Sequence, residues 1–381
     1  MRPDFQILAD GKDATAQFRD RLINMKVTDK AGVESDEVEV TLDDRDGAIT
    51  LPRRGVTIDV SLGYRETGLS RIGKYKIDEV ESSGPPQQIV IRGRPADMSG
   101  GLKTARKHSW ENTTLDQVVR TIASRNTLTP VCSVKASIDR LDQMNESDLH
   151  FITRIARQYD ATASIKGGKL LVLPRGGQAK SASGKKLPVI VLTRKDIKSW
   201  RWSASDRDAS GGVKVKTHNP KTGKTLATLI PDKTNPNGPV RVVRHPVPAK
   251  GRAAATAKGA LERGNRSTIT LSLTLPGRAD LVAERQVRVS GIKSGVDGLY
   301  PIESVTHDYS AGGWSTSAEL GVSKETLKKS RAKKGKKKKA ENVEGARAVS
   351  AIQGALADAA RARRDALITA TDYLLMPDYP I

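Results

Sequence analysis

Apolar and polar residues alternate along much of the first 95 positions of this chain, which restricts the folds open to it. The segment 38–42 reads Val-Glu-Val-Thr-Leu, and the same period of two recurs over 56–62, 75–77 and 89–91. Side chains of a strand point alternately to its two faces, so this pattern predicts strands with one buried and one solvated face. Turn residues between the strands, such as the Gly-Pro-Pro at 84–86, favour an antiparallel barrel or sandwich.

A helical pattern replaces the alternation near Ala105. An Asn-Thr-Thr-Leu sequence at 112–115 predicts the start of one helix, and Ser147 is a natural N-cap for a second. Each is followed by apolar residues at spacings of three and four, which place one face of the helix in a core. Two glycines at 167–168 between apolar runs predict a tight hairpin. The region up to Arg175 is therefore expected to be a compact module of two helices and two strands.

Strands resume after a segment at 176–186 that is rich in Gly, Ser, Ala and Lys and predicts a flexible linker. Trp200 and Trp202 alternate with polar residues. An alanine-rich stretch at 253–263 predicts a short helix inside this second strand-rich unit. Further short strands are expected near 213–215, 226–229, 269–273, 287–289, 302–305 and 315–320.

The end of the chain combines a basic run with an apolar terminus. Residues 324–340 are basic and low in complexity, which predicts an extended linker, and a weakly amphipathic helix is expected from about Val343. The lysine run suits phosphate binding, contact with an acidic protein surface, or a merely solubilising role. The aromatic terminus is unfavourable in water and is expected to dock on a partner. The candidate partner-binding residues are Lys333, Lys334, Lys336, Lys337, Lys338, Lys339, Tyr373, Leu374, Leu375, Met376 and Tyr379.

The chain has a net charge of +22 and a pI near 10.0, which attracts nucleic acid, acidic lipid or acidic proteins. Much of this charge is spread along the chain, and diffuse charge is more typical of a solvated surface than of a binding site. Cys132 is the only cysteine, which excludes an intramolecular disulfide and suits a reducing cytoplasm. No apolar run reaches membrane-spanning length and no secretory leader is recognisable, so we expect a soluble protein without membrane insertion.

Motifs for catalysis, metals and cofactors are missing or incomplete. Gly223-Lys224-Thr225 matches the end of a phosphate-binding loop, but His218 stands where that motif needs its first glycine. A β-turn is therefore predicted there. The five histidines do not lie at metal-ligand spacing from one another or from the cysteine. We predict no catalytic residue, no metal site and no cofactor.

Two weaker patterns leave hydrolase activity as an alternative. His307 precedes Asp308, although no Gly-x-Ser-x-Gly nucleophile motif accompanies them. Acidic residues cluster at 43–46 and at Glu79 with Glu81, and a glycosidase needs an acid and a base about 5–10 Å apart. In alternating strands these acids fall on solvated faces or in turns, so a solvated acidic surface is the favoured interpretation.

Several segments carry a more specific pattern over roughly residues 1–322. They are GKYKIDEV (73–80) with IRGRPADM (91–98), SWENTTL (109–115), DQMNESDLHFITR (142–154) with YDA (159–161), and VTHDY (305–309) with GGWSTS (312–317). Together they resemble the late control protein D family, the hub proteins of contractile phage tails. Hub portions of type VI secretion spike proteins are similar.

The resemblance implies a mainly β (α+β) fold: two tube-like antiparallel β-barrel domains with a small α/β module between them. The basic linker and a C-terminal helical extension lie beyond the family core. The expected parts are the first barrel (1–104), the module (105–175), a linker with the start of the second barrel (176–196), the second barrel with a short helical insertion (197–322), the basic linker (323–340), and the C-terminal helix and docking tail (341–381).

The resemblance also implies a non-enzymatic structural role. Three copies would form a ring that adapts the sixfold tail tube to the threefold spike and forms part of the DNA passage. Expected partners are the homotrimer, the tail tube protein, the central spike protein, the tape measure protein and other baseplate proteins, with transient DNA contact in the lumen. The expected location is the tail baseplate of the virion, after assembly in the host cytoplasm. The alternatives are a tail-associated cell-wall hydrolase and a nucleic-acid-binding protein that uses the basic run.

Overall fold

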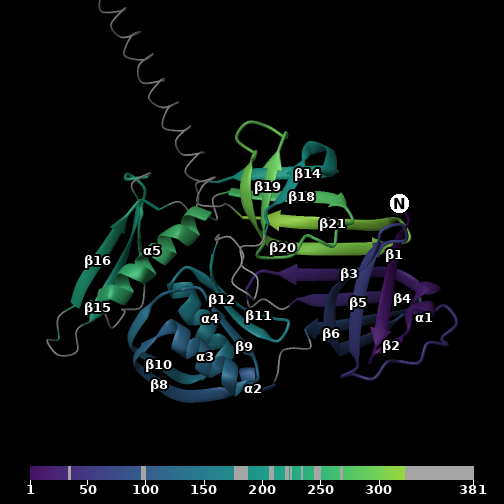
Figure 1. Cartoon of the computed structure of the whole chain (residues 1–381), viewed down its shortest axis with the longest axis horizontal. Helices are drawn as coiled ribbons and strands as arrows, with labels where there is room; N and C mark the ends of the chain where they lie inside the picture. The colour runs from purple at the N-terminus through teal and green to yellow at the C-terminus, as the bar shows by residue number, and fades with distance from the viewer. Residues whose placement is uncertain are drawn as a thin grey trace, which may run out of the picture. The chain divides into compact units, whose positions relative to one another are not determined.

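The computed structural model describes residues 1–321, apart from the gaps 33–35, 96–99, 176–187, 206–209, 219–222, 224, 233–234, 244–249 and 267–268. The predicted linkers, the C-terminal helix and all the candidate partner-binding residues, from Lys333 to Tyr379, lie outside the described residues. The described part is dominated by antiparallel strands (Figure 1). This confirms the mainly β composition expected from the sequence.

The first β unit follows the predicted alternation. Strand β4 (Glu37–Asp43) buries every second residue, because Val38, Val40 and Leu42 face the core. They pack with apolar side chains from the other strands of the unit. The elements are β1 (Pro3–Ala9), β2 (Lys12–Asp13), α1 (Thr15–Arg19), β3 (Leu22–Lys30), β4, β5 (Thr57–Tyr64), β6 (Gly68–Ser83) and β7 (Gln88–Pro95).

The middle module has the two predicted helices, with the predicted N-cap Ser147 on one and Thr114 as the N-cap of the other. The Thr114 side chain accepts a hydrogen bond from the backbone of Gln117 at 3.3 Å, and Ser147 accepts one from His150 at 3.2 Å. Each cap satisfies a helix N–H group that has no partner within the helix. The elements are α2 (Gly100–Lys103), β8 (Ala105–Thr114), α3 (Leu115–Arg125), β9 (Thr129–Cys132), β10 (Ser137–Ser147), α4 (Asp148–Gln158), β11 (Ala161–Lys166) and β12 (Lys169–Pro174).

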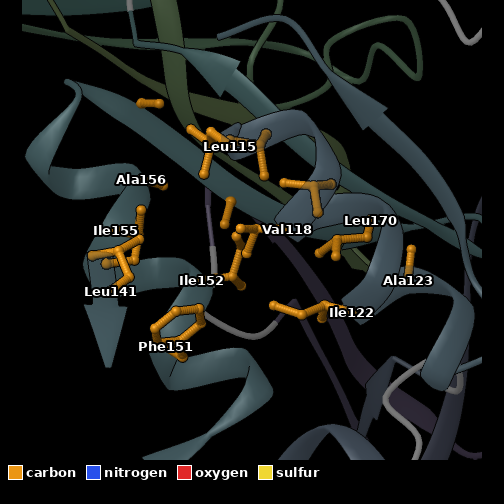
Figure 2. Packing of buried hydrophobic residues seen from close by; sticks show 14 of the residues in the cluster. Leu115, Val118, Ile122, Ala123, Leu141, Phe151, Ile152, Ile155, Ala156 and Leu170 are labelled. Atoms are coloured by element: carbon orange, nitrogen blue, oxygen red, sulfur yellow. The ribbon is translucent and has the colours of Figure 1, made fainter. Parts of the chain in front are cut away.

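The two facing helices and the strands of the module enclose one apolar core (Figure 2). Phe151 and Ile152 of α4 meet Val118 and Ile122 of α3, and all four side chains are fully buried. The predicted hairpin between β11 and β12 is confirmed, with both glycines of its turn at positive φ. The expectation of only two strands was wrong, because β8, β9 and β10 also belong to the module. Strand β8 is exposed and polar except at Trp110, so it gives no alternation signal.

The second β unit consists of β13 (Ile190–Thr193), the 3-10 turn η1 (Arg194–Asp196), β14 (Ser199–Ala204), β18 (Ile269–Pro276), β19 (Gln286–Ser290), β20 (Gly298–Ser310) and β21 (Gly313–Leu320). An insertion between β14 and β18 contains β15 (Gly212–His218), β16 (Thr225–Pro231), β17 (Val240–Val242) and α5 (Lys250–Arg266). The predicted helix at 253–263 is therefore confirmed but longer. Residue Thr225 begins a strand that pairs with β15, which excludes a phosphate-binding loop because that motif leads into a helix.

One continuous sheet connects the two β units. Its order is β14-β18-β21-β20-β3-β4-β7-β6-β5-β1-β2, and Figure 1 shows β21, β20 and β3 side by side. The connection is made by β20 and β3, whose residues pair from Ser304 with Lys30 to Ser310 with Asn24. The hydrogen bonds close neither unit into a barrel within the described residues. Two separate closed barrels were expected, and this feature of the expectation is not seen in the single chain.

Side chains also cross between the two units. Trp314 of β21 belongs to the apolar core of the first unit. Its ring lies 5.2 Å from the ring of Tyr64 in β5, and the Tyr64 hydroxyl donates a hydrogen bond to the Gly277 carbonyl at 3.0 Å. The two β units therefore share both backbone pairing and core packing.

A polar face across both β units

The candidate functional site is one face of the continuous sheet, which we call the polar face. The strand register places Thr274, Ser317, Thr306, Thr28 and Glu37 in one row across five neighbouring strands. The hydroxyls of Thr28 and Thr306 lie 3.5 Å apart, across the β3–β20 boundary. The row therefore continues from one β unit into the other.

The next row of the polar face is charged. It runs through Ser315, Asp308, Lys26, Glu39, Arg92 and Glu79. Flanking positions on the same face add further charges, so that from β14 to β6 it carries the carboxylates Glu37, Glu39, Asp43, Glu79, Glu81, Asp308 and Glu319 and the cations Lys26, Lys30, Lys74, Lys76, Arg92, Arg94 and Arg201. Carboxylates and cations are therefore comparable in number on this face, although the whole chain carries +22.

Arg92 is the centre of the acidic part of the polar face. Its guanidinium contacts Glu39 at 2.7 Å, Glu79 at 3.0 Å and Glu81 at 3.1 Å. The hydrogen bonds that Arg92 donates to Glu39 and Glu81 raise the pKa of Arg92 above its usual value. The glutamates are thus tied to one cation instead of being set as an acid and a base, which confirms the interpretation as a solvated acidic surface.

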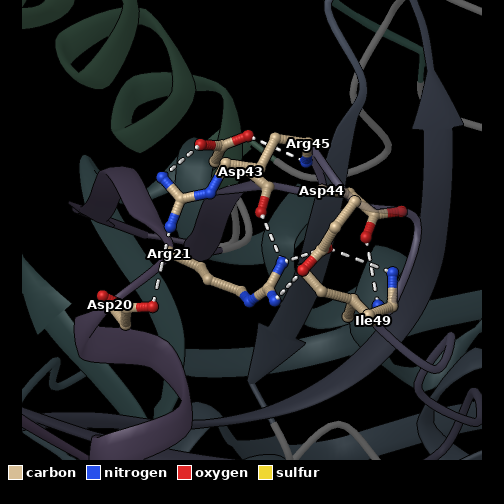
Figure 3. A network of polar contacts seen from close by, with 8 residues as sticks. Asp20, Arg21, Asp43, Asp44, Arg45 and Ile49 are labelled. Atoms are coloured by element: carbon tan, nitrogen blue, oxygen red, sulfur yellow. Dashed lines mark hydrogen bonds and ion pairs between the residues drawn. The ribbon is translucent and has the colours of Figure 1, made fainter.

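The second predicted acidic cluster has the same character (Figure 3). Arg21 holds Asp46 through two contacts of 2.6 Å, and the hydrogen bonds from Arg21 lower the pKa of that carboxyl. Asp44 accepts a hydrogen bond from the backbone of Ile49 at 3.0 Å. Arg45 contacts Asp43 at 3.3 Å. These acids order a turn, and their partners leave no poised acid–base pair among them.

The residues considered for hydrolytic or metal chemistry are not brought together. His307 is buried, and its Nδ1 lies 3.0 Å from the Thr316 hydroxyl. Burial lowers the pKa of His307 to about 4. Asp308, the next residue along the strand, lies on the opposite, polar face. Within the described residues, no three His, Cys, Asp or Glu side chains are grouped as metal ligands.

Sequence reasoning identified single stretches of the polar face but not the whole. The alternation at β4 predicted a solvated face at Glu39, Thr41 and Asp43, and in the structure Glu37 continues it. The alignment of Glu37 and Glu39 with Thr306 and Asp308, almost 270 residues later, depends on the pairing of β3 with β20. No local pattern in either strand specifies that pairing, so the extent of the face is visible only in the structure.

Comparison with known proteins places these features in a family. The sequence matches the family described as phage tail baseplate hub (GPD) over residues 37–313. It is 35% identical over 367 residues to a probable baseplate hub protein of Escherichia phage 186, an alignment that covers 84% of this chain and 93% of the relative. It is 34% identical over 363 residues to the corresponding protein of Escherichia phage P2, with 84% and 94% covered.

Solved structures of tail proteins have the same fold. The 43 kDa tail protein of prophage MuSo2 from Shewanella oneidensis superposes with a TM-score of 0.66 at 15% identity, covering 85% of this chain and 99% of that one. The tail protein from Neisseria meningitidis MC58 gives a TM-score of 0.64 at 14% identity, with 84% and 97% covered. The matched family region, the two relatives and the shared fold lead to one conclusion: the chain belongs to the phage tail baseplate hub family.

Proposed function

We propose that this chain is a non-enzymatic structural hub of a contractile-tail baseplate in the virion, assembled in the host cytoplasm. Three copies form a ring in which the two β units of each chain provide six similar segments. Such a ring adapts the sixfold tail tube to the threefold central spike. The proposed partners are two further copies of the chain, the tube protein, the spike protein, the tape measure protein and other baseplate proteins.

The observation that carries the proposal is the polar face. It crosses both β units without interruption, so three chains would line a passage with three copies of a continuous surface. Its carboxylates stand beside a comparable number of cations, so the face attracts the DNA backbone only weakly. A lumen of this kind lets DNA pass without retaining it. Contact of DNA with the hub is therefore transient.

The ends of the sheet supply the means of ring closure. Within the described residues, β14 pairs only with β18, and β2 pairs only with β1. An unpaired strand edge exposes N–H and C=O groups that readily pair with another chain. Most of β14 is exposed, and the Trp200 side chain on it is 38% exposed. Edge pairing between neighbouring copies would cover both ends of the sheet.

The C-terminal extension is also proposed to dock on a partner protein. Its lysine run (Lys333 to Lys339) and apolar terminus (Tyr373 to Tyr379) are proposed to contact a neighbouring baseplate component. No helix in the described part of the chain is long and apolar enough to cross a membrane, and the proposal includes no membrane insertion.

Reversing the charge of the polar face tests the lumen assignment. In tails built with Glu37→Lys, Asp308→Lys and Glu319→Lys combined, we expect assembly to proceed and DNA release to slow at least tenfold, because the lumen then attracts phosphate groups. Raising the salt concentration in a release assay should restore part of the rate, since screening weakens this attraction. Electron microscopy of the tails and the kinetics of DNA release are the measurements.

The matched control reverses three exposed acids elsewhere: Asp20→Lys, Glu111→Lys and Asp139→Lys. It changes the net charge by the same amount but leaves the polar face unaltered. We expect release at the rate of the unmodified tail. Equal slowing in both variants, or normal release with the polar-face variant, would show that the polar face does not line the passage.

A further inference from the structure

The insertion between β14 and β18 contains a three-stranded sheet with one covered face and one open face. The strand order is β16-β15-β17, and α5 lies along β15 and β16 (Figure 1). Val213 and Val215 of β15 are buried and pack against alanines of α5. Lys214 and Lys216 alternate with them and are exposed, because successive side chains of a strand point to opposite faces. We call the face that carries these two lysines the insertion face.

The insertion face combines apolar and basic side chains. The strand register places Leu229 of β16 and Val242 of β17 on either side of Lys214. Val240 lies two residues before Val242 and therefore on the same face. The side chains of Leu229, Val242 and Val240 are 50%, 49% and 51% exposed. None of the described positions of this face carries a carboxylate.

This composition limits what the insertion face can bind. A cluster of half-exposed apolar side chains is typical of an interaction site. A nucleic acid would pair with Lys214 and Lys216 but leave the apolar side chains in water. A purely apolar segment would remove the ammonium groups from water without pairing them, which is unfavourable. The face therefore fits a segment in which carboxylates stand beside large apolar side chains.

Residues 365–381 of this chain have the matching chemistry. They include three aspartates and no lysine or arginine, although the whole chain has 65 lysines and arginines. Asp372 and Asp378 enclose a Tyr-Leu-Leu-Met run at 373–376. We call residues 365–381 the acidic segment, and they lie outside the described residues.

The acidic segment is tethered to the insertion face by the chain itself. It is separated from the end of β21 by the 44 residues 321–364. Even a continuous helix of this length would span roughly 66 Å at 1.5 Å per residue, so the tether does not confine the segment to the end of β21. A tethered segment has a higher effective concentration at its own chain than a free partner protein has.

We propose that the acidic segment covers the insertion face of its own chain before the baseplate assembles. Its apolar side chains cover Leu229, Val240 and Val242, and its aspartates pair with Lys214 and Lys216. The proposed docking of the extension on a partner protein would then begin with release from this face. The contact depends neither on ring formation nor on the lumen assignment. Failure of the test below would leave both standing, and failure of the lumen test would leave this contact standing.

The test measures whether the chain's own acidic segment blocks the insertion face. A labelled synthetic peptide of residues 365–381 is added to two full-length proteins, the wild type and a variant with Leu374→Asp and Leu375→Asp. The variant loses the centre of the apolar run. In fluorescence anisotropy, we expect the peptide to bind the variant roughly tenfold or more tightly than the wild type, because the intramolecular competitor is lost.

Charge reversal locates the binding site. In the variant background, Lys214→Glu with Lys216→Glu should weaken peptide binding roughly tenfold or more, because carboxylates would then face aspartates. The matched control is Lys12→Glu with Lys293→Glu, since both lysines are exposed and lie outside the insertion. The control should bind the peptide as tightly as the variant without it.

A second peptide distinguishes the insertion face from the lysine run (Lys333 to Lys339). It carries Leu374→Asp and Leu375→Asp, so it is more acidic and less apolar than the first peptide. Binding to the lysine run would favour this second peptide. The insertion face should bind it roughly tenfold or more weakly, because two buried leucines are lost from the contact.

Several results would overturn the proposal. Equal binding of the first peptide to the wild type and the variant would show that the face is not covered in the free chain. Absence of binding to the variant, or binding that the changes at Lys214 and Lys216 leave unaltered, would show that the segment does not recognise this face. Blocking that weakens as the wild-type chain is diluted would assign the segment to a neighbouring copy instead.

Discussion

Replacing Lys166 with methionine is expected to destabilise the fold by about 3 kcal/mol, the order of magnitude for removing one partner of a buried ion pair. Lys166 at the end of β11 contacts Asp29 of β3, and it lies 3.8 Å from Asp36 and 3.3 Å from the carbonyl of Lys30. The three side chains are only 23%, 15% and 18% exposed. Without the ammonium group, two shielded carboxylates face each other. Urea denaturation at neutral pH measures the loss.

The same cluster joins the module to both β units. The second oxygen of Asp29 accepts a hydrogen bond from the backbone of Ala283 at 2.7 Å. Next to it, Glu284 accepts one from the backbone of Gly32 at 3.2 Å. Lys166 of the module therefore binds Asp29 of the first β unit, and Asp29 also accepts a hydrogen bond from the second β unit. We expect the Lys166→Met variant to lose module docking, seen as faster hydrogen exchange in β11.

The substitution Asp36→Asn is the matched variant. The pH dependence of its stability distinguishes it from Lys166→Met. Burial and the neighbouring Asp29 raise the pKa of Asp36 to about 7, even though Lys166 opposes the rise. An unfolded chain has the ordinary value of about 3.9. Between these values the folded state keeps a proton that the unfolded state has lost, so the wild-type stability falls as the pH rises from about 4 to 7.

In Asp36→Asn this part of the pH dependence should disappear, because the amide does not titrate. The variant should be at least as stable as the wild type at pH 7. A pH profile identical to that of the wild type, or a loss as large as that of Lys166→Met, would contradict the assignment of Asp36 as the protonated member of the cluster.

Trp314→Ala is expected to have an effect of similar size, about 3–5 kcal/mol, the usual range for truncating a buried aromatic side chain. The Trp314 side chain is 5% exposed and packs in the core of the first β unit although it comes from the second. Its loss should therefore weaken both units together. Thermal denaturation followed by near-ultraviolet and far-ultraviolet circular dichroism should give one transition at a lower temperature, coincident for the two signals.

Gly277 provides a control that isolates this packing. A Cβ atom at Gly277 would lie 1.9 Å from Cδ2 of Trp314, so Gly277→Ala should destabilise the wild type by more than 1 kcal/mol through overpacking. In the Trp314→Ala background the obstructing ring is gone, and the same substitution should be nearly neutral. Additive effects of the two substitutions would show that Trp314 does not occupy the position described.

The parts of the fold that the sequence predicts are those with a local cause. The alternation at Val38 and Val40 reports which face of β4 is buried, and Thr114 and Ser147 cap their helices through bonds to residues three positions away. Period and capping depend on neighbours in the chain, so they can be predicted from one segment at a time.

The missed features depend on contacts between distant segments. Strand β8 shows no alternation of apolar and polar residues, because Trp110 is its only buried residue. Its pairing with β10 therefore cannot be predicted from its own sequence. Nothing near Lys166 in the sequence indicates Asp29 or Asp36. The pairing of β3 with β20 brings the ends of the described chain together, and it replaces two independent barrels by one sheet.

The mass of the purified full-length chain in solution shows whether three copies form the proposed ring. Analytical ultracentrifugation, over a range of concentrations and with the cognate spike protein added, distinguishes one copy of the 41.1 kDa chain from three. A ring of three copies, closed through the edge strands β14 and β2, predicts a trimer. A chain that stays monomeric at every concentration, both alone and with the spike protein, would contradict this account of the hub.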